Sequence, residues 1–206
     1  MLKRRITVFI LCLMVLASSL AFSLGKSSPE DRYNQAIELL QEGDFTSAAP
    51  IFQELGHYLD AGKYAMYTQA LAKADAGNYA LAATTMSALS GFMDSQLQAS
   101  YYTGRALEAI QEYEEAGEVY EKILLFRDVT DRYAALPLLI LQRDYAAADS
   151  REKQGDAAAD LENRRSHYVR AKSAFAQLGS YSDSQKRVAT LTEKINAVDY
   201  AAADSL

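Results

Sequence analysis

The chain has 206 residues, of which 50% are hydrophobic and 23% are charged, and it contains three prolines. This composition predicts an ordered chain that forms one domain or one array of repeats, and it excludes disorder and collagen-like structure. The 27 acidic residues outnumber the 21 basic ones, and the net charge of -6 argues against a large surface for nucleic acid.

Residues 1–25 are expected to lie outside the folded part of the protein. The cations Lys3, Arg4 and Arg5 precede an apolar run over residues 6–24, a pattern that is typical of a signal peptide or of an N-terminal membrane anchor. In either case the three cations stay in the cytoplasm and the rest of the chain is exported. We therefore expect a secreted or periplasmic protein, or one anchored to the outer face of the cytoplasmic membrane.

The only cysteine, Cys12, lies inside this apolar run. A lipoprotein cysteine would close the run behind a small residue, whereas Leu11 precedes Cys12 and Leu13 follows it. We therefore favour a small apolar residue of the signal core as its role. Residues 26–206 contain no thiol, so their stability must come from packing and not from disulfides or cysteine-bound metal.

Six sets of residues recur at intervals of 34, which indicates three successive copies of one structural unit. A fourth copy follows 55 residues after the third, so the fourth unit carries an insertion of 21 residues. The sets, in chain order, are Phe45, Tyr79, Tyr113 and Tyr168; Ala48, Ala82, Ala116 and Ala171; Phe52, Met86, Tyr120 and Phe175; Leu55, Leu89, Ile123 and Leu178; Tyr58, Phe92, Phe126 and Tyr181; and Asp60, Asp94, Asp128 and Asp183.

The spacing within one copy predicts a hairpin of two helices. Steps of three and then four residues, from Phe45 to Ala48 to Phe52, place these side chains on one face of the second helix. A first helix precedes it, with Tyr33 on its inner side, and Gly43 ends that helix because glycine tolerates the left-handed conformation. One hairpin cannot bury its apolar face alone, so the copies must stack.

The sequence thus predicts an all-α fold, an α-solenoid of about four helix-turn-helix units. In the fourth unit we expect Tyr145 to begin the second helix, which 23 extra residues lengthen before Tyr168, with Gly155 as a break. The expected units cover residues 29–60, 61–94, 95–128 and 129–183, and a terminal helix over residues 184–206 completes the repeat domain of residues 29–206.

These units resemble the tetratricopeptide repeat, a helix-turn-helix unit with the same 34-residue period. The resemblance covers residues 29 to about 200 and rests on the Gly-Asp-Phe turn at 43–45, the alanine and aromatic sets, and small residues in the first helices. The usual tryptophan is absent, and a Tyr-x-Asp link at residues 58–60 replaces the usual closing proline. The chain is similar to a divergent variant with a Tyr-x-Asp-Ala or Tyr-x-Asp-Ser link that occurs in exported or membrane-anchored bacterial proteins. The resemblance implies a concave groove that holds a peptide.

Two roles are considered for the aspartate set, metal binding and a structural role. Successive aspartates should lie about 10 Å apart along the stack, the distance between packed helices, which is too far to share a cation. We therefore predict that each aspartate side chain caps the helix that follows it. Ser28, followed by Pro29, is predicted to cap the first helix in the same way.

Tyrosines also recur once per unit, as Tyr33, Tyr67 and Tyr101. We favour interior packing for them, and the alternative is that their hydroxyl groups line the concave groove. The first helices are expected to form a polar wall of this groove. The candidate partner-binding residues on the wall are Asn34, Tyr67, Thr68, Tyr102 and Arg105.

No catalytic pattern accompanies these repeats. His57 and His167 are isolated, and there is no glycine-rich phosphate loop. We expect no enzyme and no catalytic, cofactor-binding or metal-binding residues. The predicted function is a non-enzymatic interaction module outside the cytoplasm that binds a peptide or protein segment of another exported or envelope protein, without nucleic acid or a small-molecule substrate, and contacts the membrane only through its N-terminal segment. The alternative is a structural or self-assembling component of the cell envelope.

Overall fold

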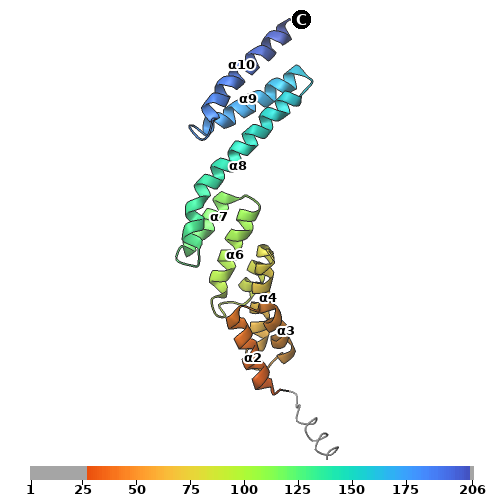
Figure 1. Ribbon diagram of the computed structural model, residues 1–206, viewed down its shortest axis with the longest axis vertical. Coiled ribbons are helices and arrows are strands. Elements are labelled where there is room, and N and C mark those ends of the chain that lie inside the picture. Colours follow the sequence, from red (N-terminus) through yellow and green to blue (C-terminus); the bar gives the residue numbers. More distant parts are fainter. Residues whose placement is uncertain (1–26, 205–206) are drawn as a thin grey trace, which may run out of the picture.

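The protein is an elongated stack of helices (Figure 1). The structure is a computed structural model that describes residues 27–204, and every regular element in that range is helical. The elements are α2 (Pro29–Glu42), α3 (Phe45–Leu55), α4 (Ala61–Asp75), α5 (Tyr79–Ala88), α6 (Ser95–Ala109), α7 (Tyr113–Tyr120), the short 3₁₀ helix η1 (Glu121–Ile123), α8 (Val129–Ala157), α9 (Leu161–Gln177) and α10 (Ser184–Ala203).

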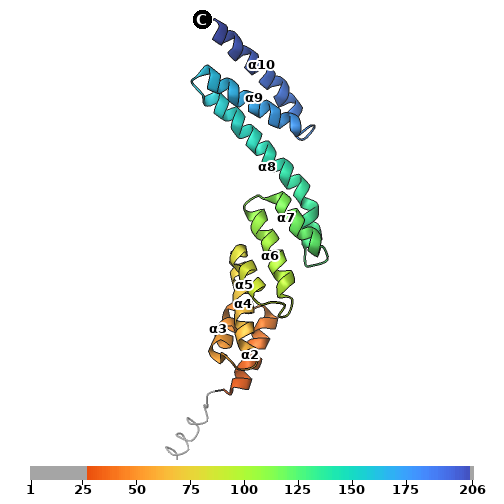
Figure 2. The same ribbon diagram turned by 180° about the vertical axis from the view of Figure 1, so that it is seen from behind.

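Each helix packs chiefly against its neighbours in the sequence, and the view from behind in Figure 2 shows the same succession. Four hairpins follow one another, α2 with α3, α4 with α5, α6 with α7 and α8 with α9, and α10 closes the stack. The predicted all-α solenoid is confirmed. The leader or anchor predicted for residues 1–25 lies outside the described residues.

The first hairpin begins and turns at the cap residues and the glycine that the sequence predicts. The Ser28 hydroxyl accepts a hydrogen bond from the Asp31 N–H at 3.0 Å, and the Asp31 carboxylate accepts one from the Ser28 N–H at 3.0 Å, so two of the free donors at the start of α2 are paired. Gly43 ends α2 with a φ of 83°, and the Asp44 carboxylate caps α3 through the Ser47 N–H. The predicted cap and turn are confirmed.

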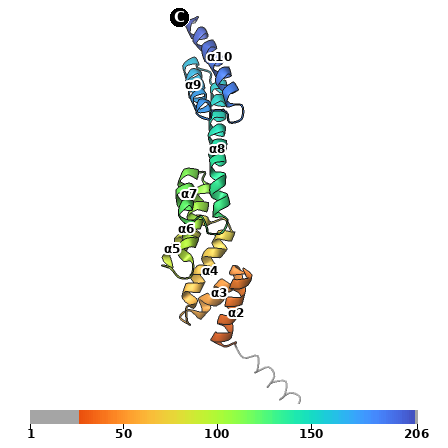
Figure 3. The ribbon, with the colours of Figure 1, turned by 90° about the vertical axis from the view of Figure 1, so that its left-hand side faces the viewer.

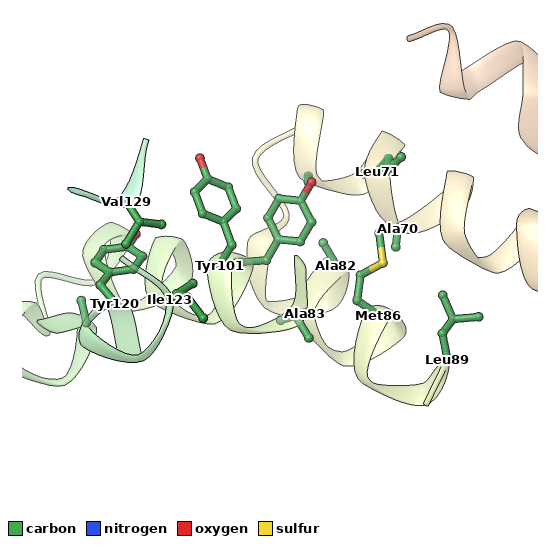
Figure 4. Close-up of a cluster of buried hydrophobic side chains, with 14 of the residues drawn as sticks. Ala70, Leu71, Ala82, Ala83, Met86, Leu89, Tyr101, Tyr120, Ile123 and Val129 are labelled. Atoms are coloured by element: carbon green, nitrogen blue, oxygen red, sulfur yellow. The ribbon is translucent and has the colours of Figure 1, made fainter. Parts of the chain in front are cut away.

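The core consists of the repeated alanine and aromatic residues. Ala48, Ala82, Phe52 and Met86 are fully buried, as their equivalents in the later units are. Figure 4 shows the middle of this core, where Tyr120 lies beside Val129. Small alanines let adjacent helices approach closely, and each large side chain that fills the remaining space contributes about 1.5–3 kcal/mol through burial. The inner face predicted from the sequence is therefore correct.

The aspartates occupy the first position before each following helix, but their side chains do not cap it. Asp60, Asp94, Asp128 and Asp183 make no side-chain cap bond. Three of them instead accept a hydrogen bond from the tyrosine of their own unit's first helix. The donors and acceptors are Tyr67 to Asp94, Tyr101 to Asp128 at 2.9 Å, and Tyr145 to Asp183. The capping prediction is thus wrong for the side chains, three of which instead join the two ends of their unit.

Interior packing, the favoured interpretation of the tyrosine set, is confirmed for two of its members. Tyr67 and Tyr101 are buried, while Tyr33 is half-buried and packs edge-on against Phe52. A buried tyrosine hydroxyl requires a polar partner, and the aspartate of the link supplies it. The tyrosine and aspartate sets are therefore two halves of one contact.

The fourth unit departs from its predicted form. Its second helix α9 has 17 residues against 8 to 11 in the earlier units, but the first helix α8 takes up more of the insertion, with 29 residues against 14 or 15. Tyr145 lies inside α8 and does not begin the second helix, because the chain has no break between Val129 and Ala157. Figure 3 shows α8 running from the α6–α7 hairpin to α9 and α10. It therefore joins two hydrophobic cores.

Candidate groove of the first helices

The links between units share an unusual backbone conformation. In each link an N–H three residues after the aromatic residue donates to the aromatic residue's carbonyl, at 3.0 to 3.2 Å, so the link is a tight turn. The residue between the aromatic residue and the aspartate, here called the middle residue of the link, has a positive φ in all four turns. The angles are 48° at Leu59, 53° at Met93, 50° at Arg127 and 52° at Ser182. This turn position is dominated by glycine in proteins, and other residues adopt such a conformation at a cost of about 1–2 kcal/mol.

These four middle residues are all exposed. Their neighbours in the link are held in place, since the aromatic ring packs in the stack and the aspartate accepts its tyrosine hydrogen bond in three of the four links. The middle residue consequently makes the sharp turn and directs its side chain away from the packed link. Met93, for example, remains 55% exposed.

Two of these residues line a groove of about 330 Å³ along the first helices α2, α4 and α6. The groove is mainly apolar, and its floor includes the buried Tyr67 and Leu71. The lining residues are Ile37, Leu40, Gln41, Phe45, Tyr64, Tyr67, Leu71, Met93, Gln98 and Arg127. We call this the first-helix groove.

Gln98 is a lining residue of the first-helix groove, and its side-chain carbonyl is buried and unpaired. Its side chain is 3% exposed, and its amide nitrogen donates to the Asp94 carboxylate at 2.9 Å and to the Tyr67 hydroxyl at 3.5 Å. These bonds fix the orientation of the amide, since a carboxylate only accepts. The Gln98 carbonyl oxygen, Oε1, has no hydrogen-bond partner. Buried acceptors are rarely left unpaired in native structures, because an unmet one costs about 1–3 kcal/mol.

The Tyr67 hydroxyl beside this amide stays protonated. Burial and the hydrogen bond to Asp94 raise the pKa of Tyr67 well above its usual value. The hydroxyl therefore donates to Asp94 and uses its oxygen to accept from Gln98. This small network holds the polar end of the groove rigid.

Arg127 supplies the only charge among the lining residues of the first-helix groove. Its guanidinium carbon lies 4.9 Å from the centre of the Tyr101 ring and 5.5 Å from that of Phe126, and one nitrogen donates to the Tyr102 hydroxyl at 3.4 Å. Within residues 27–204 no carboxylate forms an ion pair with Arg127. Aromatic faces thus position a cation whose charge is not neutralised by a partner.

Of the five residues predicted for partner binding, Tyr67 alone lines the first-helix groove. Asn34 is exposed on α2, seven residues before Gln41 and hence on the same face of the helix. Thr68 is fully buried, and its hydroxyl donates to the Tyr64 carbonyl at 2.7 Å within its own helix. The placement of Thr68 on an exposed polar wall is therefore wrong.

Tyr102 and Arg105 are also taken up by contacts within the protein. Tyr102 is buried and stacks on Tyr79 with the ring centres 6.4 Å apart. The Arg105 guanidinium donates to the hydroxyls of Tyr79, at 2.6 Å, and Tyr101, at 3.1 Å. The open position expected for Tyr102 is thus wrong, and Arg105 is a half-buried residue that ties two units together.

Sequence reasoning did not find Met93, Gln98 or Arg127 as groove residues. Met93 and Arg127 are equivalent positions 34 residues apart, so the repeat itself aligns them. The turn conformation that exposes them has no signal in the sequence, because neither residue is glycine or asparagine. The burial of Gln98 depends on Tyr67, which lies 31 residues earlier in the chain.

Neither a metal site nor a membrane-spanning helix is present among the described residues. Between residues 27 and 204, no group of three or more His, Cys, Asp or Glu side chains is arranged to hold a metal ion. None of the helices in this range is long and apolar enough to span a bilayer.

Comparison with known proteins gives no family for this chain. No family model, curated protein or solved structure matches it significantly.

Proposed function

We propose that the protein is a non-enzymatic binding module that holds a segment of another protein in the first-helix groove. The observation that carries this proposal is an apolar groove shared by three helical units, with the exposed Met93 and the cation Arg127 among its lining residues. A bound segment covers the apolar lining with its own side chains. The groove is open along the helices and does not surround a small molecule on all sides. This shape favours a peptide over a small-molecule substrate.

The proposed partner is another exported or envelope protein. This part of the proposal rests on the apolar N-terminal segment after three cations and on the resemblance of the repeats to the exported tetratricopeptide variant. In this proposal the membrane is contacted only through residues 1–25, and the acidic net charge of -6 disfavours nucleic acid as a partner.

Photo-crosslinking from single positions tests the proposal. A photoreactive amino acid at Gln41, an exposed residue of the first-helix groove, should form an adduct with a second protein in intact cells. Leu81 on α5 is exposed and outside the groove, so the same substitution there is the matched control. Adducts from both positions in equal yield, or from neither, would contradict binding in the groove.

A self-assembling structural component is the second candidate, and one observation favours it. Leu125 is fully exposed beside a second groove of about 430 Å³. The other residues that line this groove are Leu97, Glu121, Lys122, Ile123, Leu124 and Phe126. A second copy of the chain is the occupant in this alternative. Sedimentation equilibrium tests this alternative. Self-assembly predicts that the mass of the wild-type protein rises with concentration and that the mass of Leu125→Glu does not. A wild-type protein that is monomeric at all concentrations would rule the alternative out.

A further inference from the structure

We propose that Met93 and Arg127 determine which peptide the first-helix groove accepts, and that the preferred segment carries an acidic residue next to an apolar one. This inference rests on the proposed function and names the chemistry of its partner. Three features support it: the turns that expose Met93 and Arg127, the apolar lining of the groove and its single charge.

The first feature is the strained conformation at two groove positions. Glycine would adopt the positive φ of Met93 and Arg127 without strain, yet the chain has a long side chain at both. The same positive φ occurs at Leu59 and Ser182, which do not line the groove, so it is a property of every link, and its effect at the groove is to expose two long side chains. The strain places the exposed side chain of Met93 and the guanidinium of Arg127 along one groove.

The second feature is the apolar lining. Met93 is 55% exposed and lines the same groove as Leu40 and Leu71, so an apolar side chain of a bound peptide covers these residues. The volume of about 330 Å³ accommodates a short stretch of chain, so a few side chains carry the selectivity.

The third feature is charge. Among the lining residues Arg127 is the only charged one, and aromatic rings rather than carboxylates surround its guanidinium. A guanidinium pairs best with a carboxylate, which accepts two parallel N–H bonds from it. An acidic side chain on the peptide therefore satisfies Arg127, while a basic one is repelled.

Peptide selection with the full chain, purified in a mild detergent, tests this specificity. A library of random seven-residue peptides displayed on phage is the probe. The wild-type protein should enrich peptides in which Asp or Glu lies next to Leu, Ile, Met or Phe. Arg127→Glu should reverse the preference toward Lys and Arg and weaken binding of the wild-type peptides by at least tenfold, since a favourable pair becomes a like-charge contact.

The matched control for charge is Arg151→Glu. Arg151 is exposed on α8 and does not line the first-helix groove, so the variant has the same net charge as Arg127→Glu. It should select the same peptides as the wild type. A reversed preference in this control as well would assign the effect to overall charge and overturn the inference.

One further variant separates recognition from folding. Met93→Gly relieves the strained φ, so it should melt at or above the wild-type temperature while losing affinity for apolar residues at the neighbouring position. Undiminished affinity of Met93→Gly for the selected peptides would show that Met93 has only a structural role.

The outcomes distinguish this inference from the proposed function. Enriched peptides without acidic residues, together with adducts from Gln41, would overturn the inference and leave the binding module intact. An unchanged acidic preference in Arg127→Glu would overturn it as well. If no peptide is enriched and Gln41 forms no adduct, both proposals are wrong.

Discussion

Gly104 of α6 lies directly against the ring of Tyr120 of α7, so closely that a Cβ atom at residue 104 would be 2.2 Å from a ring carbon. Tyr120 is fully buried, and its hydroxyl donates to the Glu108 carboxylate at 2.6 Å. The ring is therefore held from two sides and cannot move away cheaply. The close contact explains why a helix interior contains glycine, which otherwise weakens helices.

Gly104→Ala should therefore destabilise the protein. Overpacking costs about 1–3 kcal/mol, which exceeds the gain of about 1 kcal/mol from the better helix propensity of alanine. Urea denaturation followed by circular dichroism measures the difference. Gly62→Ala is the control, because a Cβ there meets only the Gly56 carbonyl at an ordinary 3.4 Å, and it should not be destabilised. Equal stability of Gly104→Ala and the wild type would show that the α6–α7 contact is looser than described.

The bond between Tyr101 and Asp128 predicts a loss of stability in acid. Burial works against the charged form of Asp128, but hydrogen bonds from Tyr101 and Arg132 outweigh it, and the pKa of Asp128 falls below its usual 3.8. A lowered pKa in the folded state stabilises the protein above pH 3.8, and this contribution disappears as the pH falls through the folded-state pKa. Asp128→Asn should therefore be less stable than the wild type at neutral pH and lose less stability in acid.

Thermal melting at neutral pH and at about pH 3 measures this difference. Asp131→Asn removes a neighbouring exposed carboxylate from the same helix and is the control, with an expected effect of less than 0.5 kcal/mol at neutral pH. The prediction is wrong if Asp128→Asn and the wild type lose equal stability on acidification.

The raised pKa of Tyr120 predicts that the protein loses stability at alkaline pH. Its burial, assisted by the hydrogen bond to Glu108, raises the pKa of the hydroxyl above its usual 10. The stabilising contribution is thus fully present below pH 10 and is lost as the pH rises toward the folded-state pKa, because the unfolded chain ionises first. Stability of the wild type should fall from about pH 9 to about pH 11 more steeply than that of Tyr120→Phe. Parallel curves for the two proteins would contradict the raised pKa.

A buried carboxylate joins α8 to α10. Glu152 of α8 is buried and bonds Arg187 at 2.8 Å and Lys194 at 2.9 Å, both on α10. Glu152→Gln should destabilise the protein by about 1–3 kcal/mol, since it weakens two charged hydrogen bonds in a buried position. Asp156→Asn is the control, because Asp156 bonds the same Lys194 from an exposed site, and an asparagine there still accepts the hydrogen bond from Tyr168. This variant should cost less than 1 kcal/mol. Urea denaturation compares the variants, and equal losses would contradict the role of burial.

The helical units and their buried faces can be predicted from the amino-acid sequence alone. An amphipathic helix repeats its apolar residues with the period of the helix, and a solenoid repeats the whole helix pair, so both periods are visible without any tertiary information. Ala48, Phe52 and their equivalents were identified as core on this basis, and they are buried. The turn at Gly43 was equally visible, since its conformation depends on a local preference of glycine.

The groove and the form of the fourth unit depend on contacts between residues that are distant in the sequence. The first-helix groove joins side chains from three units, and which polar groups remain unpaired there depends on contacts such as that between Tyr67 and Gln98, 31 residues apart. The sequence near either residue does not predict such a pair. The left-handed turns at Met93 and Arg127 follow from anchored neighbours on both sides and not from the preference of either residue. In the same way, tertiary packing decided that the insertion extends α8 across two cores, because its alanines and charged residues favour a helix without fixing where that helix belongs.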